Sequence, residues 1–378
     1  MANPEQTIEA GTVLNERYRI DAVLGSGGFG EVLAAEDLLE GRSVAVKVLH
    51  DGAAQADPRA ALRMRQEAEI LKAIRHPNIV QVLEVGSFSG GQFLVMERVD
   101  GAGLDEIFSR EGTLAPDRLL PLVRQLLQAL SVAHARDVLH RDPKPENILV
   151  SEIDGRESIK LVDFGVAKAG ASLTSDDPDD AITLVKTRVG SFVGTPRYAA
   201  PEMVVGDPAG PPADLFCVGL VVYEALAGAP LIKGTTHSEV ISALVFPRPF
   251  DLSGLPPDWS RWLEPVLEKA PERRVQSALE ALRNLDEIFG PSFDDDDVDI
   301  AETAQWEPLQ LDEAALREHS NAPAPPRQPM SPGPPPRRDP RTLEEVGKPR
   351  RGAEPALMTA IVVLLAIVAY LAYLVFFQ

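Results

Sequence analysis

Residues His140–Gly165 read HRDPKPENILVSEIDGRESIKLVDFG, in which two apolar runs flank the turn dipeptide Asp154-Gly155. In an antiparallel hairpin the numbers of paired residues have a constant sum, here about 309. That sum predicts that Asn147 and Asp163 lie side by side at the open end of the hairpin. Two oxygen-bearing side chains in one place suit Mg²⁺, which prefers a few protein oxygens together with nucleotide phosphates.

A glycine-rich turn, Gly25-Ser-Gly-Gly-Phe-Gly-Glu-Val32, lies upstream between two strand-like segments. Glycines there let backbone N–H groups approach phosphate oxygens closely. A dinucleotide-binding turn has the same spacing but opens a helix, whereas the residues that follow here read as strands. In the second strand the period of two puts Ala45 and Lys47 on one face and three valines on the other. This pattern predicts a site for a phosphate and a flat base.

Five motifs occur in a fixed order: the glycine-rich turn, VAVK at 44–47, HRDPKPEN at 140–147, DFG at 163–165 and GTPRYAAPE at 194–202. Together they resemble the eukaryotic-like serine/threonine protein kinases, including those of bacteria, over about residues 18–289. The resemblance implies an α+β, bilobal fold with a small antiparallel β-sheet lobe carrying one helix and a large, mainly helical lobe.

The expected domains follow from this resemblance and from the composition of the rest of the chain. They are an N-terminal extension at 1–17, a kinase domain at 18–290 with lobes at 18–99 and 100–290, a linker at 291–355 and a membrane helix at 356–377.

The resemblance also implies ATP as the phosphoryl donor. Lys47 would contact its α and β phosphates, the backbone of Glu97 and Val99 would bond adenine, and Asn147 and Asp163 would hold Mg²⁺, with Mn²⁺ as an alternative. The expected nucleotide-binding residues are Gly25, Ser26, Gly27, Gly28, Phe29, Gly30, Val32, Ala45, Lys47, Glu97, Val99 and Leu149.

The catalytic roles are implied in the same way. Asp142 would accept the proton of the substrate hydroxyl, Lys144 would neutralise charge on the moving phosphoryl group, and Thr195 would support that pair. A lysine two residues after the aspartate is typical of the kinases that act on Ser/Thr in protein substrates. Glu67 and Glu69 are both candidate partners for Lys47, and the family's spacing to the His-Pro-Asn motif selects Glu67.

Several residues are expected to be structural. Asp214 would grip the backbone of the catalytic loop, and Glu202 and Arg274 would form an ion pair that braces the large lobe. His140 would lie beneath the loop. The residues Val123, Leu126, Leu127, Leu130 and His134 recur at helical spacing and predict a core stripe, with His134 a core rather than a catalytic histidine. Cys217 is expected to be a packed, apolar residue.

One residue departs from the family pattern. Pro143 stands where the family has leucine, which removes a backbone N–H from the loop but no catalytic side chain. We therefore expect an active kinase, with a nucleotide-binding pseudokinase or a membrane-anchored interaction scaffold as the alternatives.

Regulation by phosphorylation is a further expectation. In the family, an arginine placed like Arg141 pairs with a phosphorylated residue of the activation segment. The candidates are Thr174, Ser175, Thr183, Thr187 and Ser191. We expect autophosphorylation at Thr187 or Ser191, the two nearest to Thr195.

Composition limits the function classes. The chain has 378 residues with 37 Lys or Arg, 57 Asp or Glu and a net charge of −20, which disfavours binding to nucleic acid. One cysteine excludes a disulfide scaffold, and the six histidines show no zinc-ligand spacing.

The acidic and proline-rich residues 291–355 predict a disordered linker. Within it, 291–321 is strongly acidic and is read as a solvated spacer rather than a cation or partner site. The proline-rich 322–341 is read as a semi-rigid spacer, with a polyproline ligand for a partner as the alternative.

Residues 356–377 are uncharged and largely apolar, and as a helix they would span about 33 Å. They predict a transmembrane helix in a lipid membrane. Because Lys348, Arg350 and Arg351 precede it, the positive-inside rule puts the kinase domain in the cytoplasm. The N-terminus shows no signal peptide, so a tail-anchored topology is expected.

Overall fold

A computed structural model describes residues 8–27, 30–50, 58–88, 91–164 and 196–291 of the chain. Several predictions lie outside these residues: the roles of Gly28, Phe29 and Thr195, the phosphorylation candidates, and the linker and transmembrane helix of 292–377. Within the described ranges, no helix has both the length and the apolar character needed to cross a bilayer.

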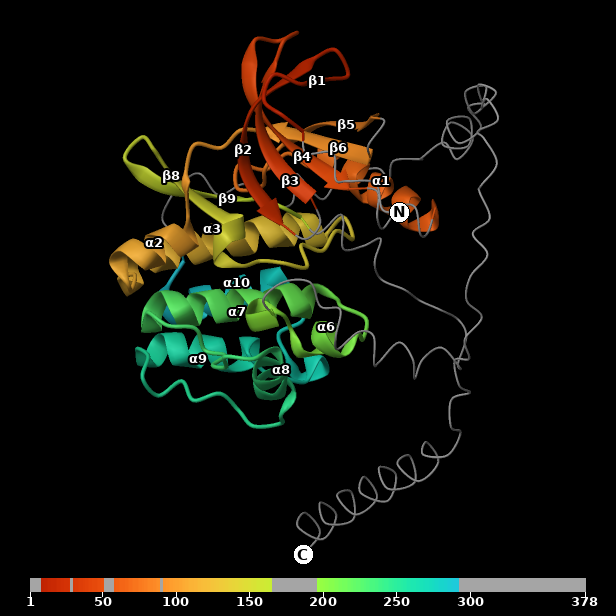
Figure 1. The fold of residues 1–378 in the computed structure, drawn as a ribbon. Helices are drawn as coiled ribbons and strands as arrows, with labels where there is room; N and C mark the ends of the chain where they lie inside the picture. The colour runs from red at the N-terminus through yellow and green to blue at the C-terminus, as the bar shows by residue number, and fades with distance from the viewer. Residues whose placement is uncertain (1–7, 28–29, 51–57, 89–90, 165–195, 292–378) are drawn as a thin grey trace, which may run out of the picture. The chain divides into compact units, whose positions relative to one another are not determined.

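The first part of the chain forms one antiparallel sheet of six strands in the order β1-β2-β3-β4-β6-β5 (Figure 1). The strands are β1 Val13–Leu14, β2 Tyr18–Gly27, β3 Gly30–Asp37, β4 Arg42–His50, β5 Val82–Phe88 and β6 Gly91–Glu97. One helix, α1 Pro58–Ala73, connects β4 to β5 and packs against β5. This is the small lobe that the sequence predicts.

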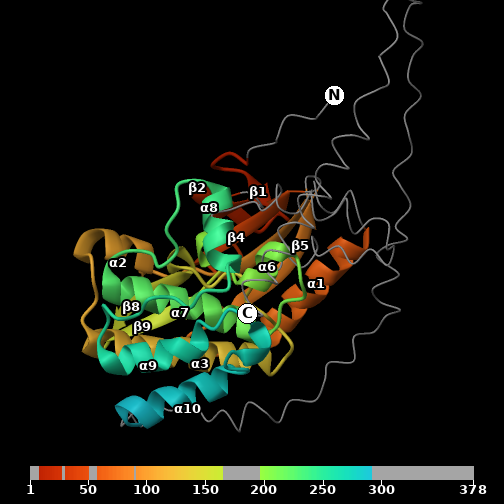
Figure 2. The same cartoon turned by 90° about the horizontal axis from the view of Figure 1, so that it is seen from below.

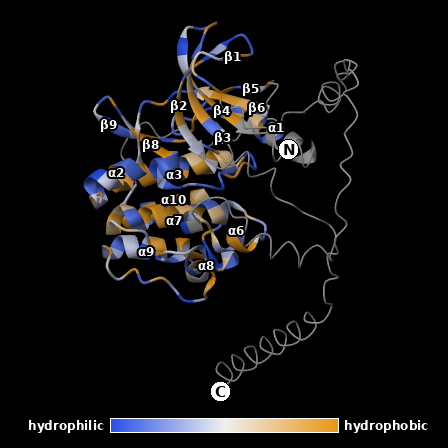
Figure 3. Ribbon diagram, viewed as in Figure 1, coloured by the Kyte–Doolittle hydropathy of each residue, from blue (hydrophilic) through white to orange (hydrophobic). Residues whose placement is uncertain are grey.

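The two faces of this sheet belong to two separate cores, as the alternation in β4 predicts. Val44, Val46 and Val48 pack in a cluster of their own with Tyr18 and Phe93. Ala45, from the opposite face, joins the main core instead. Figure 3 shows the strongly hydrophobic middle of the sheet in orange. Because side chains alternate along a strand, Lys47 shares the face of Ala45.

The second part of the chain is mainly helical. Its helices are α2 Leu104–Glu111, α3 Pro116–His134, α6 Pro201–Val205, α7 Pro211–Ala227, α8 His237–Val245, α9 Pro257–Val266 and α10 Ala278–Phe289. α7 is apolar on nearly all sides and lies between α3 and α9. At Gly219 a Cβ would come within 2.9 Å of Val266, so glycine permits close packing of α7 on α9. Seen from below, α10 lies beside α3 and α9 (Figure 2).

A small sheet, β7-β8-β9, lies next to this helical core, and its strands are β7 Ala102–Gly103, β8 Ile148–Ile153 and β9 Arg156–Leu161. In the hairpin of β8 and β9, Ile148 pairs with Leu161, which gives the predicted sum of 309. The next pair continues the register, because the Val162 N–H donates to the Asn147 carbonyl over 2.9 Å. The hairpin prediction is therefore confirmed, and Asp163 follows directly after the residue opposite Asn147.

Candidate active site

The loop before β8 is held from below by one buried carboxylate. Asp214, in the first turn of α7, is 1% exposed and accepts backbone hydrogen bonds from His140 (2.8 Å) and Arg141 (2.7 Å). Arg141 has a φ of 63°, a left-handed conformation that non-glycine residues rarely adopt. The expected grip of Asp214 on the loop is thus present, and it stabilises a backbone shape that would otherwise be unfavourable.

His134 contributes to this grip, which its place in the apolar stripe of α3 did not indicate. The stripe itself is confirmed, because Val123, Leu126, Leu127 and Leu130 are all buried. The His134 side chain is 7% exposed and its Nε2 donates to Asp214 Oδ2 over 2.8 Å. Burial alone would raise the pKa of Asp214, but this bond and the nearby histidines outweigh it and hold the pKa below its usual value.

His140 lies beneath the loop, as the family resemblance implies. Its Nε2 donates to the Val162 carbonyl over 2.8 Å, and its Nδ1 accepts the Asp142 N–H over 3.2 Å. Its ring also packs on Phe164, with centroids 4.6 Å apart. Complete burial lowers the pKa of His140, so the ring is neutral and orients both Asp142 and the strand that leads to Asp163.

Two polar residues of the loop, Asn147 and Lys144, converge on the carboxylate of Asp142. Asn147 donates through Nδ2 to the Asp142 carbonyl (2.9 Å) and to Asp142 Oδ2 (3.3 Å). Lys144 Nζ lies 3.5 Å from the same Oδ2. Pro143 is buried and all these contacts form around it. The loop thus presents a carboxylate and an ammonium group side by side, a suitable arrangement for proton acceptance next to an anionic substrate.

Asp163 meets Lys47 across the two sheets, and their side chains form an ion pair. Asn147 uses its Nδ2 for Asp142, which leaves its Oδ1 as an acceptor, and its backbone pairs with Val162, the residue before Asp163. Among the described residues no group of three His, Cys, Asp or Glu side chains could hold a metal. Two hard oxygen ligands nevertheless fit Mg²⁺, because this ion takes its other ligands from water and phosphates.

Glu67 does not pair with Lys47 among the contacts that the described residues make. Its carboxylate instead accepts from the Arg141 guanidinium over 3.0 and 3.2 Å. The expectation that Glu67 partners Lys47 therefore differs from the observed arrangement, although Glu67 does face the catalytic loop. The reason is a competition: Asp163 already pairs with Lys47, and one nitrogen of the Arg141 guanidinium, Nη1, lies within hydrogen-bond distance of both Glu67 carboxylate oxygens.

The sheet face above the loop fits a flat base. Val32 and Leu94 are the strand partners of Lys47, and Ala45 has little exposure. In the segment after β6, neither the N–H nor the C=O of Val99 has a partner among the described residues, so both can bond a ligand. Leu149 is half-buried in β8. Gly25 and Ser26 pair with Val32 and Glu31, and Gly27 pairs with Gly30.

Glu97 has a contact that the sequence did not predict. Its N–H donates to the Gln81 carbonyl over 2.9 Å, and its carboxylate accepts from Lys160 Nζ over 2.6 Å. Lys160 comes from β9, so this ion pair ties the end of β6 to the hairpin of β8 and β9. The N–H of Glu97 is thus already used, and its carboxylate also accepts from the Gln81 N–H over 2.8 Å.

The expected brace of the large lobe is confirmed. Glu202 accepts two hydrogen bonds from Arg274, of 2.7 and 3.1 Å, and both side chains are at most 5% exposed. Arg274 also donates to the carbonyls of Pro212, Glu268 and Lys269. Cys217, also in α7, is buried as expected, and burial raises its pKa.

Comparison with known proteins gives one family and a set of relatives. Residues 18–282 match the family model described as the protein kinase domain. The chain is 36% identical over 275 residues to serine/threonine-protein kinase pkn2 of Myxococcus xanthus, and 36% identical over 280 residues to serine/threonine-protein kinase PknB of Mycobacterium leprae. These matches cover 71% and 72% of this chain but only 32% and 43% of the relatives.

A solved structure agrees with these sequence matches. The kinase domain of Mycobacterium tuberculosis PknI superposes with a TM-score of 0.57 at 26% identity, covering 74% of this chain and 99% of that domain. The bilobal arrangement described above is therefore shared with a known structure.

Proposed function

The chain belongs to the protein kinase domain family, and from that premise we propose that it transfers the γ-phosphoryl group of ATP to serine or threonine hydroxyls of proteins. The observation that carries this proposal is the convergence of Lys144 and Asn147 on the Asp142 carboxylate, beside the Lys47–Asp163 pair. The names of the relatives, which are serine/threonine-protein kinases, support the choice of acceptor.

In the proposed reaction, the substrate hydroxyl lies against Asp142, whose carboxylate accepts the proton. The hydroxyl oxygen forms a bond to the γ-phosphorus as the bond to the β-phosphate oxygen breaks, so that a phosphoester and ADP result. Lys144, 3.5 Å from Asp142 Oδ2, lies where it can donate to the oxygens of the moving phosphoryl group. Most of the rate acceleration comes from position and electrostatics.

Asn147 Oδ1 and the Asp163 carboxylate would hold Mg²⁺, or Mn²⁺ in its place, and the bound ion would supply positive charge to the phosphates. In the described conformation Lys47 neutralises Asp163. When nucleotide binds, we propose that Lys47 turns to the α and β phosphates, which leaves Asp163 free for the metal.

Regulation follows from the double use of Arg141. Its backbone is held by Asp214 and its guanidinium by Glu67. A phosphate group carries about −1.5 to −2 charges, so a phosphorylated activation-segment residue would compete with Glu67 for Arg141. We propose that autophosphorylation at Thr187 or Ser191 releases Glu67 to pair with Lys47, a contact that active kinases require.

We further propose that residues 356–377 anchor the protein in a membrane with its kinase domain in the cytoplasm, and that 322–341 acts as a spacer or as a ligand for a partner. The uncharged run and the basic residues before it support the anchor. Sedimentation of the full chain with membranes after alkaline washing, compared with a chain ending at 355, tests it. A full chain that stays in the wash would contradict the anchor.

The proposed activity is tested by incubating the purified full chain with radiolabelled ATP, Mg²⁺ and a general protein substrate. We expect label on serine or threonine and none with Asp163→Asn. Nucleotide binding without any transfer would favour the pseudokinase alternative, and Pro143→Leu would then show whether that residue is responsible. Comparing phosphoproteins in cells with wild-type and Asp142→Asn chains would name the substrates.

A further inference from the structure

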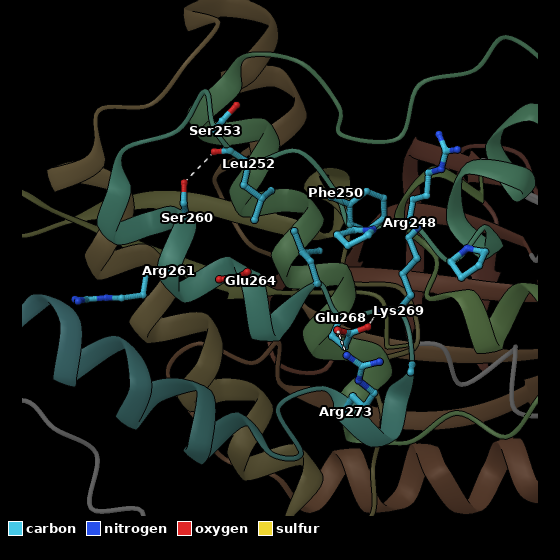
Figure 4. A pocket seen from close by; sticks show the side chains of 14 residues that line it. Arg248, Phe250, Leu252, Ser253, Ser260, Arg261, Glu264, Glu268, Lys269 and Arg273 are labelled. Carbon is cyan, nitrogen blue, oxygen red and sulfur yellow. Dashed lines mark hydrogen bonds and ion pairs between the residues drawn. The ribbon is translucent and has the colours of Figure 1, made fainter. Parts of the chain in front are cut away.

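A groove of about 770 Å³ opens on the large lobe, lined by residues that take no part in the candidate active site (Figure 4). Its walls are the segment between α8 and α9, one face of α9, and the residues just after α9. The charged residues that line it are Arg248, Arg261, Glu264, Glu268, Lys269 and Arg273. In Figure 4, Arg261 lies at one end of the groove and Arg248 and Arg273 lie toward the other.

Three of these cations are available to a ligand. Arg248 lies over the Phe246 ring at 5.4 Å and has no carboxylate partner among the described residues. Among the residues that the structure describes, Arg261 pairs only with Asp258 on its own helix, at 3.4 Å, and both side chains are more than 60% exposed. Arg273 is 71% exposed and lies 3.5 Å from Glu268. Exposed pairs of this kind contribute little, so they exchange readily for a better anion.

Lys269 has a different, structural role in the groove. Its ammonium group donates to the carbonyls of Ala243 (2.7 Å) and Phe246 (2.6 Å) at the end of α8 and lies over the Phe250 ring. Burial lowers its pKa. Lys269 therefore fixes the shape of the groove, while the three arginines provide its exposed charge.

These arginines stand out because the surrounding domain is acidic, with 43 Asp or Glu against 29 Lys or Arg in residues 1–290. The groove also offers apolar surface beside the charges, from Pro247, Pro249, Phe250 and Leu252. A fitting ligand is thus an anionic segment that also carries apolar side chains.

Such a segment follows α10 in this chain. Residues 293–300 read FDDDDVDI, five aspartates with a phenylalanine, a valine and an isoleucine. The path toward it starts at the groove wall: the Phe289 ring lies 4.8 Å from the ring of Trp259, which directly precedes Ser260 and Arg261. Arg124 fixes this exit through Asp286 and the Gly290 carbonyl.

We propose that residues 293–300 dock in this groove of the same chain, with the aspartates on the three arginines and the apolar side chains on the prolines and Phe250. Ten residues after Gly290 reach about 30 Å when extended, so the groove is within range. A short tether gives an effective concentration in the millimolar range, so even a weak site would be occupied. The docked segment covers the three arginines, so they do not bind acidic segments of other proteins.

The test measures a distance in the full chain. Gly254→Cys, at the edge of the groove where a Cβ meets open space, and Thr303→Cys carry spin labels, since the native Cys217 is buried. Pulsed electron resonance is recorded with an excess of unlabelled chain. We expect the distribution of label-to-label distances to contain a short, narrow component. The docked population that gives this component should fall about tenfold when the five aspartates become asparagine, or when Arg248, Arg261 and Arg273 become serine.

The matched control is Arg283→Ser, which removes an exposed arginine of α10 outside the groove and should leave the short component unchanged. Salt of about 0.5 M should weaken it, because screening shortens the range of charge attraction. A broad distribution that is the same for the wild-type and the five-asparagine chain would overturn the proposal. So would a short component that is present only when the unlabelled chain is left out, because the groove would then hold the segment of a second copy.

Discussion

Replacing Asp214 with asparagine tests the support beneath the catalytic loop. The two carboxylate oxygens accept three hydrogen bonds, from the backbone of His140 and Arg141 and from His134 Nε2, all within 2.8 Å. Asparagine has one oxygen, so its NH₂ group must face a buried N–H donor. The loss of a charge-assisted bond costs about 1.5–3 kcal/mol, and the orphaned donor costs about 1–3 kcal/mol more.

We therefore expect Asp214→Asn to lower the free energy of unfolding by about 3–5 kcal/mol. Guanidinium titration of the full chain measures this through the fluorescence of the buried Trp259 and Trp262. Arg141, no longer held at its left-handed φ, should also shift the loop and lower kcat by about tenfold to a hundredfold. Asp21→Asn, at 45% exposure, is the control and should change stability by less than about 0.5 kcal/mol. A loss below about 1 kcal/mol with normal kcat would refute this reasoning.

Three other predictions concern stability and regulation. Burial lowers the pKa of His76 to about 4, so only the unfolded chain takes up this proton between about pH 6.5 and 4. The free energy of unfolding should therefore fall by about 2 kcal/mol from pH 7.5 to pH 5. In thermal melting, the His76→Asn chain should lose less stability over this pH range than the wild-type chain, and the same pH dependence in both chains would contradict the role of His76. Arg274→Met leaves the buried Glu202 unpaired and should cost about 3–5 kcal/mol in guanidinium unfolding, whereas a loss under about 1 kcal/mol would argue against the brace. Arg141→Gln removes the guanidinium for which the phosphate group and Glu67 compete. Phosphatase treatment should therefore lower the kinase activity of the Arg141→Gln chain less than that of the wild-type chain, and an equal drop in both would contradict the proposed exchange of partners at Arg141.

Much of the site could be predicted because it depends on local rules. The hairpin turn at Asp154-Gly155 sets a register, and this brings Asn147 next to Asp163. Strand alternation likewise separates Lys47 from the three valines of β4. Both inferences need only a turn and a period, which a single sequence contains.

Contacts between distant segments could not be predicted in the same way. Helical spacing indicates that His134 is buried, but nothing in that spacing reveals Asp214, 80 residues later, as its partner. The choice of Glu67 between Lys47 and Arg141 depends on how the two lobes meet, and the same is true of Lys160 and Glu97. These pairs follow from tertiary packing, which sequence periodicity does not describe.

The most direct test of the proposed function compares the steady-state kinetics of wild-type and Asp142→Asn chains with ATP and a protein substrate. Asn147 and Lys144 both lie within 3.5 Å of Asp142 Oδ2, so asparagine preserves the shape of the loop but cannot accept the proton. We predict that kcat falls by about a hundredfold or more while the KM for ATP changes by less than about threefold. Equal kcat values for the two chains would contradict Asp142 as the residue that receives the proton.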